Sequence, residues 1–324
     1  SGKFAVLCRQ DIRLRVKRFA GLRPSNQSVR PVISLGDLAF VSHIPQNLAS
    51  GGGVYSRAII DHLNTVWTGG VVDVVGPETS ANPSRLSCLM WGVLSSQPSK
   101  AIFAARSGLA NAMAQAAPDQ HGVICLNSPD VLPLAERQWP DARFILVCHN
   151  IEADLFRQQV SRLPAFVRPL LSGDMARYAA LEDRAFRKAA LIIAISDKDA
   201  EAIRARHPAA KVVHIPPVFE TAQRPAGKAS KDDKLRLGFV GRMQWWPNRD
   251  AVDWMRQALT PLPDGREIHL FGAGSEDMTD RQARMIGHGF VDDPDDIWGQ
   301  IDVALCPMQS GGGLNIKLVE ALAR

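Results

Sequence analysis

The chain has 324 residues, of which 46% are hydrophobic and 22% are charged. This composition is ordinary for a globular protein, and the length favours two domains over one. No apolar run approaches the roughly 18 residues that a membrane-spanning helix requires. The first residues lack the apolar core and the cleavage site of a signal peptide, so we expect a cytoplasmic protein.

The cysteines give no sign of a metal site or of a disulfide framework. There are five, an odd number, and most stand inside apolar runs: Cys8, Cys88, Cys125, Cys148 and Cys306. No CxxC motif and no Cys–His pair has metal-ligand spacing. We therefore expect reduced core cysteines and no metal.

The net charge of +5 is concentrated at the N-terminus. Residues 1–31 contain eight Lys or Arg and a single acid, so this segment alone carries +7. A basic arm of this kind could contact an anionic membrane, here through residues 3–30 at the inner face, or be a solvated extension. Few aromatic residues stand among its charges, so we expect no nucleic-acid partner.

From residue 33, short apolar runs alternate with longer amphipathic stretches. The expected strands lie at 38–42, 71–75, 123–126, 144–148, 191–195 and 212–215, and helical patterns include 54–63, 175–188 and 198–206. We expect Gly51-Gly52-Gly53 to form a loop before the first of these helices. Alternation of this kind predicts a parallel sheet with helices on both faces.

The pattern breaks at residues 220–233, which are polar, contain Pro225 and Gly227 and show no periodicity, as an interdomain linker does. Alternation then resumes: strands are expected at 235–240, 267–271 and 303–305, and helices at 251–258, around 275–285 and from 314. We therefore predict two doubly wound α/β domains, 32–219 and 234–324. The last helix ends at Arg324 without a following strand, so we expect the second domain to be incomplete at its C-terminus.

Ligands of doubly wound folds bind beyond the carboxyl ends of the strands, so polar or glycine-rich segments at those ends are candidate site residues. Gly51-Gly52-Gly53 follows the first strand and could offer free amides, or be a flexible turn. His149 follows 144–148 and could donate to a sugar hydroxyl, or cap a loop. Arg242 follows 235–240 and could pair with phosphate oxygens, or be a surface cation.

The fourth candidate spans Gln309 to Glu320. Three glycines, Gly311, Gly312 and Gly313, precede Leu314, where the helical pattern begins. A helix N-terminus carries unpaired N–H groups and partial positive charge, which suit a diphosphate. Lys317 and Glu320 share a helix face. They could form a surface ion pair, or the carboxylate could accept hydrogen bonds from two ribose hydroxyls.

In this order, the segments resemble a GT-B glycosyltransferase of the retaining family four type (glycosyl transferases group 1), from about residue 34 to the end. The segments that carry the resemblance are 40–43 with the glycines after it, 149–152, 194–196, 239–242, 269–274, 289–292, 302–307 and 318–323. The last is similar to the family's Leu-Glu-Ala-Met-Ala signature and is the most specific of them.

The resemblance implies a nucleotide-diphosphate sugar as donor, a glycan or lipid-linked acceptor and no metal. It assigns His149, Arg242 and Glu320 to the donor sugar, the diphosphate and the ribose. The remaining implied donor contacts are Gly52 and Gly53 near the phosphates, Phe290 and Val291 beside the base, and the stretch that contains Asn248, Gly311, Gly312, Gly313, Leu314 and Lys317.

Two positions depart from the family's pattern. Gly312 stands where a second Glu is common, so the backbone would face the donor sugar there. Asn248 stands where the family has a Lys, which removes one phosphate cation. We hypothesise that Lys317 compensates for it.

Three other functions are consistent with parts of the sequence. A nucleotide-sugar epimerase of related fold would bind the same donor without an acceptor. A non-catalytic nucleotide-sugar-binding protein would keep the fold alone. A dinucleotide-dependent oxidoreductase is disfavoured, because Gly272-Ala273-Gly274 lacks the third glycine of the fingerprint, with Met278 in the stretch where it is sought. The sequence therefore predicts a glycosyltransferase.

Overall fold

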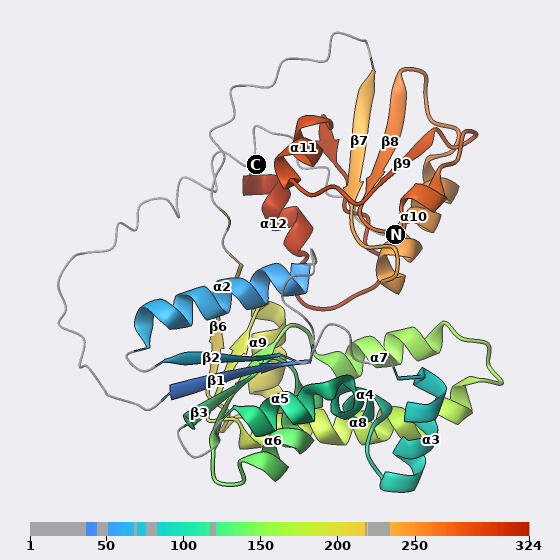
Figure 1. Ribbon diagram of the computed structural model, residues 1–324. Helices are drawn as coiled ribbons and strands as arrows, with labels where there is room; N and C mark the ends of the chain where they lie inside the picture. The colour runs from blue at the N-terminus through green and yellow to red at the C-terminus, as the bar shows by residue number, and fades with distance from the viewer. Residues whose placement is uncertain are drawn as a thin grey trace. The chain divides into compact units, whose positions relative to one another are not determined.

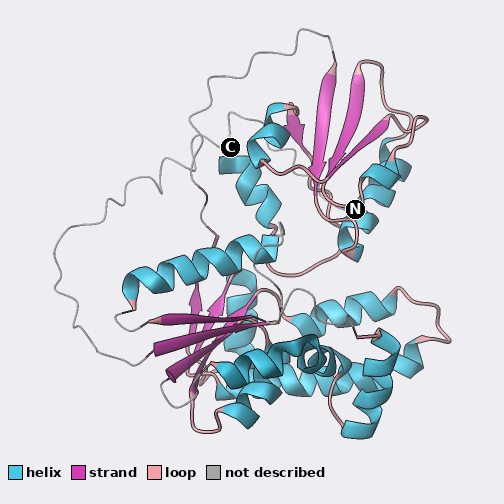
Figure 2. Ribbon diagram, in the orientation of Figure 1, coloured by secondary structure: helices cyan, strands magenta, loops and turns pink. Residues whose placement is uncertain are grey.

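A computed structural model of the chain describes residues 37–43, 51–67, 70–75, 83–116, 121–217, 219 and 234–323. The predicted basic arm, residues 1–31, lies outside the described residues, as does the predicted linker, residues 220–233. We call residues 37–217 the N-terminal domain and residues 234–323 the C-terminal domain. Each contains its own sheet (Figures 1 and 2).

The N-terminal domain contains a six-stranded parallel sheet in the order β2-β1-β3-β4-β5-β6. Its strands are β1 (Asp37–Ser42), β2 (Val71–Val75), β3 (His121–Leu126), β4 (Arg143–Cys148), β5 (Leu191–Ala194) and β6 (Val212–His214). The order reverses at β1, so the ends of β1, β3 and β4 are neighbours. This is where a doubly wound sheet binds ligands.

Helices connect these strands, and several of them pack against the sheet. They are α2 (Gly51–Val66), α3 (Arg85–Ser95), α4 (Ser99–Ala104), η1 (Ala105–Leu109), α5 (Ala110–Gln115), η3 (Pro129–Val131), α6 (Leu132–Gln138), α7 (Glu152–Ser161), α8 (Arg168–Lys188) and α9 (Asp197–Arg206). Among the described residues, no helix combines the length and the apolar character needed to cross a bilayer.

The C-terminal domain contains a four-stranded parallel sheet in the order β10-β7-β8-β9. Its elements are β7 (Leu235–Val240), α10 (Trp246–Leu259), β8 (Arg266–Phe271), η4 (Glu276–Met278), β9 (Met285–Gly289), α11 (Pro294–Gly299), β10 (Val303–Ala304) and α12 (Ile316–Ala323). Pro247 stands in the first turn of α10, where its missing N–H costs no intrahelical bond. The predicted fold class is therefore confirmed.

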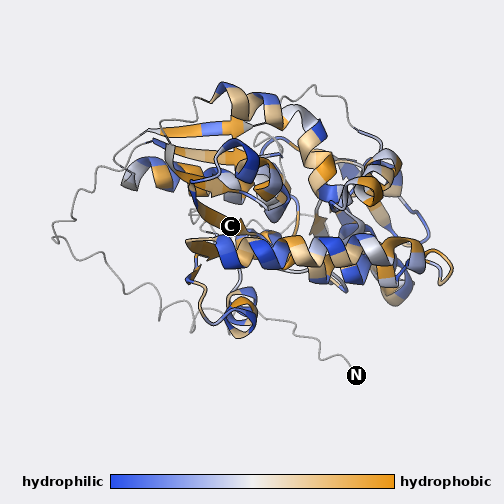
Figure 3. Ribbon diagram, turned by 90° about the horizontal axis from the view of Figure 1, so that it is seen from below, coloured by the Kyte–Doolittle hydropathy of each residue, from blue (hydrophilic) through white to orange (hydrophobic). Residues whose placement is uncertain are grey.

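The N-terminal sheet forms because its strands are mainly apolar, as strands covered on both faces must be. In the N-terminal domain, Leu38, Ala39, Phe40 and Val41 of β1 are fully buried. Alternate residues serve two cores: Ala39 and Val41 face one layer of helices, and Leu38 and Phe40 face the other. The predominantly apolar strands are visible by their hydropathy in Figure 3.

Three local predictions differ from the structure. The helix expected around 275–285 is wrong: only the short turn η4 is helical, and β9 follows it. The carboxylate of Asp280 accepts from the backbone N–H groups of Gln282 and Ala283, and Arg284 adopts a positive φ of 50°, so the chain turns back into a strand. The final helix begins at Ile316 rather than at Leu314.

The third difference concerns the first glycine segment. Gly51-Gly52-Gly53 does not form a loop; it is the first turn of α2. The hydroxyl of Ser56 donates to the carbonyl of Gly52 at 2.7 Å, within that turn. These glycines therefore present the N-terminal end of a helix.

Candidate functional site

A buried amide joins the carboxyl ends of three adjacent strands in the N-terminal domain. Asn127 directly follows β3, and its Nδ2 donates to the hydroxyls of Ser42, at the end of β1, and of Ser56 in α2, at 3.1 and 3.0 Å. Its Oδ1 lies 2.9 Å from Nε2 of His149, the residue after β4. Asn127 is 5% exposed, so these bonds replace water for a buried polar group.

The contact with Asn127 sets the chemical state of His149. Burial lowers the pKa of His149 to about 4, so the imidazole is neutral at pH 7. Because an amide oxygen only accepts, Nε2 carries the hydrogen and Nδ1 is an acceptor. The ring of Tyr55 in α2 packs edge-on against the imidazole, with 5.6 Å between centroids. The neutral ring is therefore held by its neighbours in one tautomer.

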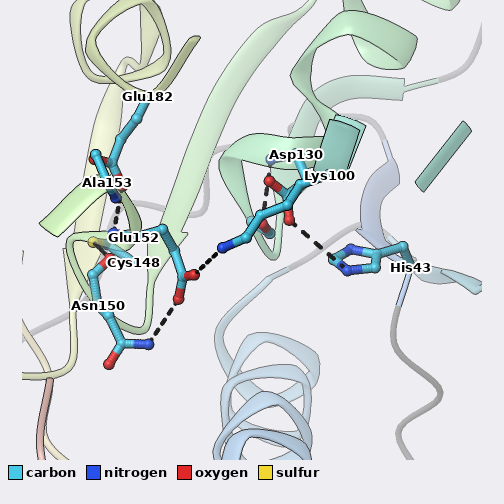
Figure 4. A network of polar contacts seen from close by, with 9 residues as sticks. His43, Lys100, Asp130, Cys148, Asn150, Glu152, Ala153 and Glu182 are labelled. Carbon is cyan, nitrogen blue, oxygen red and sulfur yellow. Dashed lines mark hydrogen bonds and ion pairs between the residues drawn. The ribbon is translucent and has the colours of Figure 1, made fainter. Parts of the chain in front are cut away.

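A second polar network, shown in Figure 4, surrounds the start of α7. Nζ of Lys100 lies 2.8 Å from a carboxylate oxygen of Glu152, and Nδ2 of Asn150 donates to the other oxygen at 2.8 Å. Burial opposes the charge on both groups, yet their attraction raises the pKa of Lys100 and lowers that of Glu152. The pair therefore stays ionised beside the strand ends.

The backbone at the start of α7 is held by a carboxylate from α8. The two oxygens of Glu182 accept from the N–H groups of Glu152 and Ala153 at 2.7 and 3.2 Å. Burial nevertheless raises the pKa of Glu182 to about 7. This carboxylate fixes the helix that begins directly after His149 and Asn150.

The predicted glycine-rich turn contacts the N-terminal domain. Oε1 of Gln158 in α7 accepts from the N–H of Gly311, and Nε2 of the same side chain donates to its carbonyl, at 3.1 and 3.2 Å. Gly313 has a φ of +65°, and a Cβ there would stand 2.2 Å from the carbonyl oxygen of His149. Only glycine fits this approach.

The start of α2 reaches the same region. A Cβ added to Gly51 would lie 3.2 Å from Ile316, the first residue of α12, whereas one on Gly52 would meet no atom within 4 Å. The open side of Gly52 therefore leaves room for a ligand at the N-terminal end of α2. Together with the Tyr55–His149 contact, this brings α2, His149 and the glycine-rich turn together.

In the C-terminal domain, three predicted residues meet beyond the end of β7. Asn248 donates from Nδ2 to the carbonyl of Arg242 at 2.8 Å, and its Oδ1 accepts from Nζ of Lys317 at 2.7 Å. The ammonium of Lys317 also lies 4.1 Å from the centroid of the Phe239 ring. Burial lowers the pKa of Lys317 to about 8. Lys317 of α12 therefore brings its amine to the side chain at position 248.

The remaining predicted residues lie on neighbouring elements. A carboxylate oxygen of Glu320 in α12 accepts from Nε1 of Trp298 in α11 at 3.4 Å. Phe290, 52% exposed, and Val291 follow β9, which is two strands away from β7. Leu314 packs against the core layer that contains Tyr55. In the described residues, no group of three His, Cys, Asp or Glu side chains is arranged to hold a metal ion.

Several polar residues of these networks were missed by the sequence reasoning. Asn127 could have been found, since it follows a predicted strand as His149 does. Lys100, Glu152 and Glu182 had no such signal: they stand within helices and meet only because α4, α7 and α8 pack together. Gln158, which binds the backbone of the glycine-rich turn, was missed for the same reason.

Comparisons with known proteins bear on the fold of the chain and on the family of its C-terminal domain. Residues 234–324 match the family model described as glycosyl transferases group 1. No match is found among curated protein sequences. Among solved structures, the chain is similar to WaaG, a glycosyltransferase involved in lipopolysaccharide biosynthesis, with a TM-score of 0.59 and 15% identity over 88% of this chain and 78% of WaaG.

Two further structures have the same fold. The trehalose-6-phosphate synthase OtsA has a TM-score of 0.56 and 12% identity, over 89% of this chain and 82% of OtsA. Anabaena Alr3699/HepE, solved in complex with UDP and glucose, has a TM-score of 0.53 and 13% identity, over 89% and 78%. Some matched structures are much longer chains, of which this chain covers 39%.

At these identities the structural likeness establishes the fold alone, whereas the family match concerns the second sheet and its helices. Both agree with the parallel sheets and with the order of the segments along the chain. The chain thus has the GT-B fold of glycosyltransferases, and its C-terminal domain matches the group 1 glycosyl transferases.

Proposed function

We propose that this chain transfers a hexose from a nucleotide-diphosphate sugar to a glycan or a lipid-linked acceptor, with retention of configuration, in the synthesis of a polysaccharide or glycoconjugate. The observation that carries the proposal is the 2.7 Å contact between Nζ of Lys317 and Oδ1 of Asn248. It supports the hypothesis that Lys317 supplies the cation absent from position 248. The cation then stands beside Arg242, whose carbonyl Asn248 also binds.

Cations at this place have a clear chemical use. When the bond between the sugar and the diphosphate breaks, negative charge develops on the departing phosphate oxygens. Fixed donors and cations stabilise such charge strongly in a site from which water is excluded. In the proposal, Arg242 and Lys317 take this role, and the chemistry requires no metal. Glu320, one helical turn after Lys317, accepts from the ribose hydroxyls.

The N-terminal domain would contribute residues at the ends of β1, β3 and β4 to the proposed site. Neutral His149 would accept a hydrogen bond from a hydroxyl of the donor sugar through Nδ1, since Nε2 already donates to Asn127. Alr3699/HepE, which has the same fold, binds UDP and glucose. This supports a nucleoside diphosphate and a hexose as the parts of the donor here.

Donor binding would change the contacts of the glycine-rich turn. The N–H group of Gly311 donates to Oε1 of Gln158. Phosphate oxygens are good acceptors for such a group. We therefore expect the diphosphate to replace the side chain of Gln158 at the turn.

The first experiment identifies the donor. The full chain is screened by thermal shift with UDP-, GDP- and ADP-sugars, because a ligand that binds the native state raises its stability by RT ln(1 + [L]/Kd). Stabilisation by one base class, at concentrations below about 1 mM, is the expected result. Absence of stabilisation by all three classes would contradict a nucleotide-sugar site.

The second experiment tests the site residues. Arg242→Ala and Glu320→Ala should each reduce kcat/KM for the donor by roughly 100-fold or more, because each removes a charged contact to the diphosphate or to the ribose. Unchanged far-UV circular dichroism shows that the fold survives, and Arg249→Ala is the matched surface control. Wild-type turnover by both variants would rule out the site.

Product analysis separates this activity from its rivals. The wild-type chain is incubated with the stabilising donor, with and without a panel of glycan and glycolipid acceptors. Sugar transfer to an acceptor supports the proposal. A changed sugar nucleotide in the absence of an acceptor would identify an epimerase, and binding without any product would identify a non-catalytic protein.

A further inference from the structure

Helix α3 places its large apolar side chains in solvent. It buries only Cys88 and Gly92, which stand four residues apart and share one helix face. Leu86, Met90, Trp91 and Leu94 are exposed, with Leu94 at 76%. Because a surface helix normally turns its apolar stripe to the core, this orientation is the reverse of the usual one.

Close packing on the opposite side maintains that orientation. A Cβ on Gly92 would lie 2.7 Å from the carbonyl oxygen of Gln97 and 3.7 Å from the carboxylate of Asp174 in α8. The same carboxylate accepts from the backbone N–H of Ser99 at 2.8 Å. The narrow face of α3 therefore sits against the α3–α4 turn and α8, and no larger side chain could take the place of Gly92.

The N-terminal part of α8 adds two more exposed apolar residues next to α3. Phe166, in the segment that leads into α8, is 80% exposed, and Leu170 in its first turn is 73% exposed. Helices α3 and α8 contact each other. They lie side by side at one end of the N-terminal domain in Figure 1, and Figure 3 shows the apolar loop at the end of the long α8 helix.

The charged side chains of the segments that form this surface are all basic. No Asp or Glu occurs between residues 79 and 118 or between residues 155 and 173. Arg85 in α3, Arg106 in η1 and Arg168 in α8 are exposed. The guanidinium of Arg106 lies 5.6 Å from the ring of Trp91, so cation and indole are presented together. We call Leu86, Met90, Trp91, Leu94, Phe166 and Leu170, with these three arginines, the apolar-basic face.

We propose that the apolar-basic face docks the N-terminal domain on an anionic lipid bilayer. Bulky apolar side chains, a tryptophan and flanking arginines match the chemistry of the bilayer interface, where the apolar groups enter the acyl boundary and the cations remain at the phosphates. The arginines of the apolar-basic face and the lack of acidic residues in its segments oppose self-association through this face, since two copies would bring like charges together. No residue of the apolar-basic face is among those assigned to the proposed sugar-transfer site.

The test measures vesicle binding by the full chain. Co-sedimentation is compared between vesicles of phosphatidylcholine alone and vesicles with one quarter phosphatidylglycerol. We expect binding to the anionic vesicles, weakened by salt, and a fall of roughly tenfold or more in the partition coefficient for Leu94→Glu/Phe166→Glu. Both side chains are more than three-quarters exposed, so the substitutions leave the core intact.

The matched control is Val213→Glu/Leu235→Glu, which adds the same charge at apolar residues that are each 37% exposed elsewhere. It should bind vesicles within about twofold of the wild type. Trp91→Phe should retain binding but lose most of the blue shift of tryptophan emission that vesicles cause. Each variant is compared with and without residues 3–30, so that any contribution of the basic arm is separated from that of the face.

Equal binding by the Leu94→Glu/Phe166→Glu variant and the control would overturn the proposal. Failure of the wild-type chain to bind anionic vesicles would also overturn it. A third contradicting result would be dimers in analytical ultracentrifugation that only the Leu94→Glu/Phe166→Glu substitutions dissociate. Donor binding by thermal shift is independent of all these outcomes, so failure of the proposed transferase activity would leave this test unaffected.

Discussion

At the scale of single residues, Lys317 is the buried cation of the proposed site. Its amine is buried against the Phe239 ring, and this burial lowers its pKa from 10.5 to about 8. A bound diphosphate would favour the charged form. The residue is therefore poised to bind an anion and is sensitive to mildly alkaline pH.

We predict that kcat/KM for the donor decreases above pH 8, approaching about tenfold per pH unit, as the amine loses its proton. Lys317→Ala should lower kcat/KM by roughly 100-fold at pH 7. Lys317→Arg should retain part of the activity and abolish the decrease, because a guanidinium stays charged. Steady-state kinetics from pH 6.5 to 9.5 measure both effects.

Lys234→Ala is the matched control, since Lys234 is half exposed and pairs with Glu267 on the surface of the same domain. It should retain the wild-type profile. Wild-type donor affinity in Lys317→Ala would show that Lys317 does not replace the missing cation.

Gly313 gives a second prediction at this scale. With a φ of +65° and the carbonyl of His149 in the place of a Cβ, Gly313→Ala must strain the turn or displace it. We expect a loss of at least about 1 kcal/mol in the free energy of unfolding. Gly52→Ala is the matched control: its Cβ meets no atom and alanine favours a helix, so stability should hold or rise by up to about 1 kcal/mol. Equal losses in urea unfolding would contradict the packing described.

At the scale of elements, Glu182 links α8 to the start of α7. Its pKa is raised by burial from 4.5 to about 7, although two backbone N–H groups donate to it. Between these pH values the folded state binds more protons than the unfolded state. The free energy of unfolding must therefore fall as pH rises from about 4.5 to about 7, by up to about 3 kcal/mol from this group.

Glu182→Gln should remove this dependence, because glutamine has no charge to bury. The variant loses one acceptor for the α7 backbone, which costs about 1 kcal/mol at low pH. We expect its stability relative to the wild type to improve from pH 5 to about pH 7 in urea unfolding and to level off above that pH. Glu201→Gln, at an exposed position of α9, is the control and should run parallel to the wild type. A constant difference for Glu182→Gln would refute the raised pKa.

At the scale of the whole molecule, the two domains have different tasks in the proposed reaction. The C-terminal domain holds the diphosphate and the nucleoside, and the N-terminal domain holds the acceptor and the apolar-basic face. The basic arm, residues 1–31, would add a further contact with an anionic surface. Its structure lies outside the described residues.

We predict that deletion of residues 3–30 weakens vesicle or acceptor association, because the positive charges of the arm would bind phosphates at an anionic surface. The Kd for the donor should stay within about twofold of the wild-type value, because the arm contributes no residue to the proposed donor site. Vesicle co-sedimentation and thermal shift with the donor are the measurements. Unchanged vesicle binding after the deletion would count against a membrane role for the arm.

Some structural features of this chain could be predicted from its sequence, and others could not. All of the described strands except β9 were predictable, because each is a mainly apolar run bounded by polar or glycine residues, and that pattern is local. The helix expected at 275–285 was wrong because the side chain of Asp280 binds two backbone N–H groups and competes with the helix. The loop predicted at Gly51-Gly52-Gly53 was wrong for another reason. Glycine disfavours helix interiors, but the first turn of a helix tolerates it.

The sequence by itself determined the fold class, the order of the strands along the chain and the segments that end at the carboxyl edges of the sheets, since these depend on periodicity within about ten residues. Only the tertiary structure decided which side chains meet. Asn127 binds His149, Lys100 binds Glu152, and Lys317 reaches Asn248 across 69 residues. Such contacts depend on the order of strands and on helix packing, and they set the charge and the hydrogen bonds of the site. No local pattern contains that information.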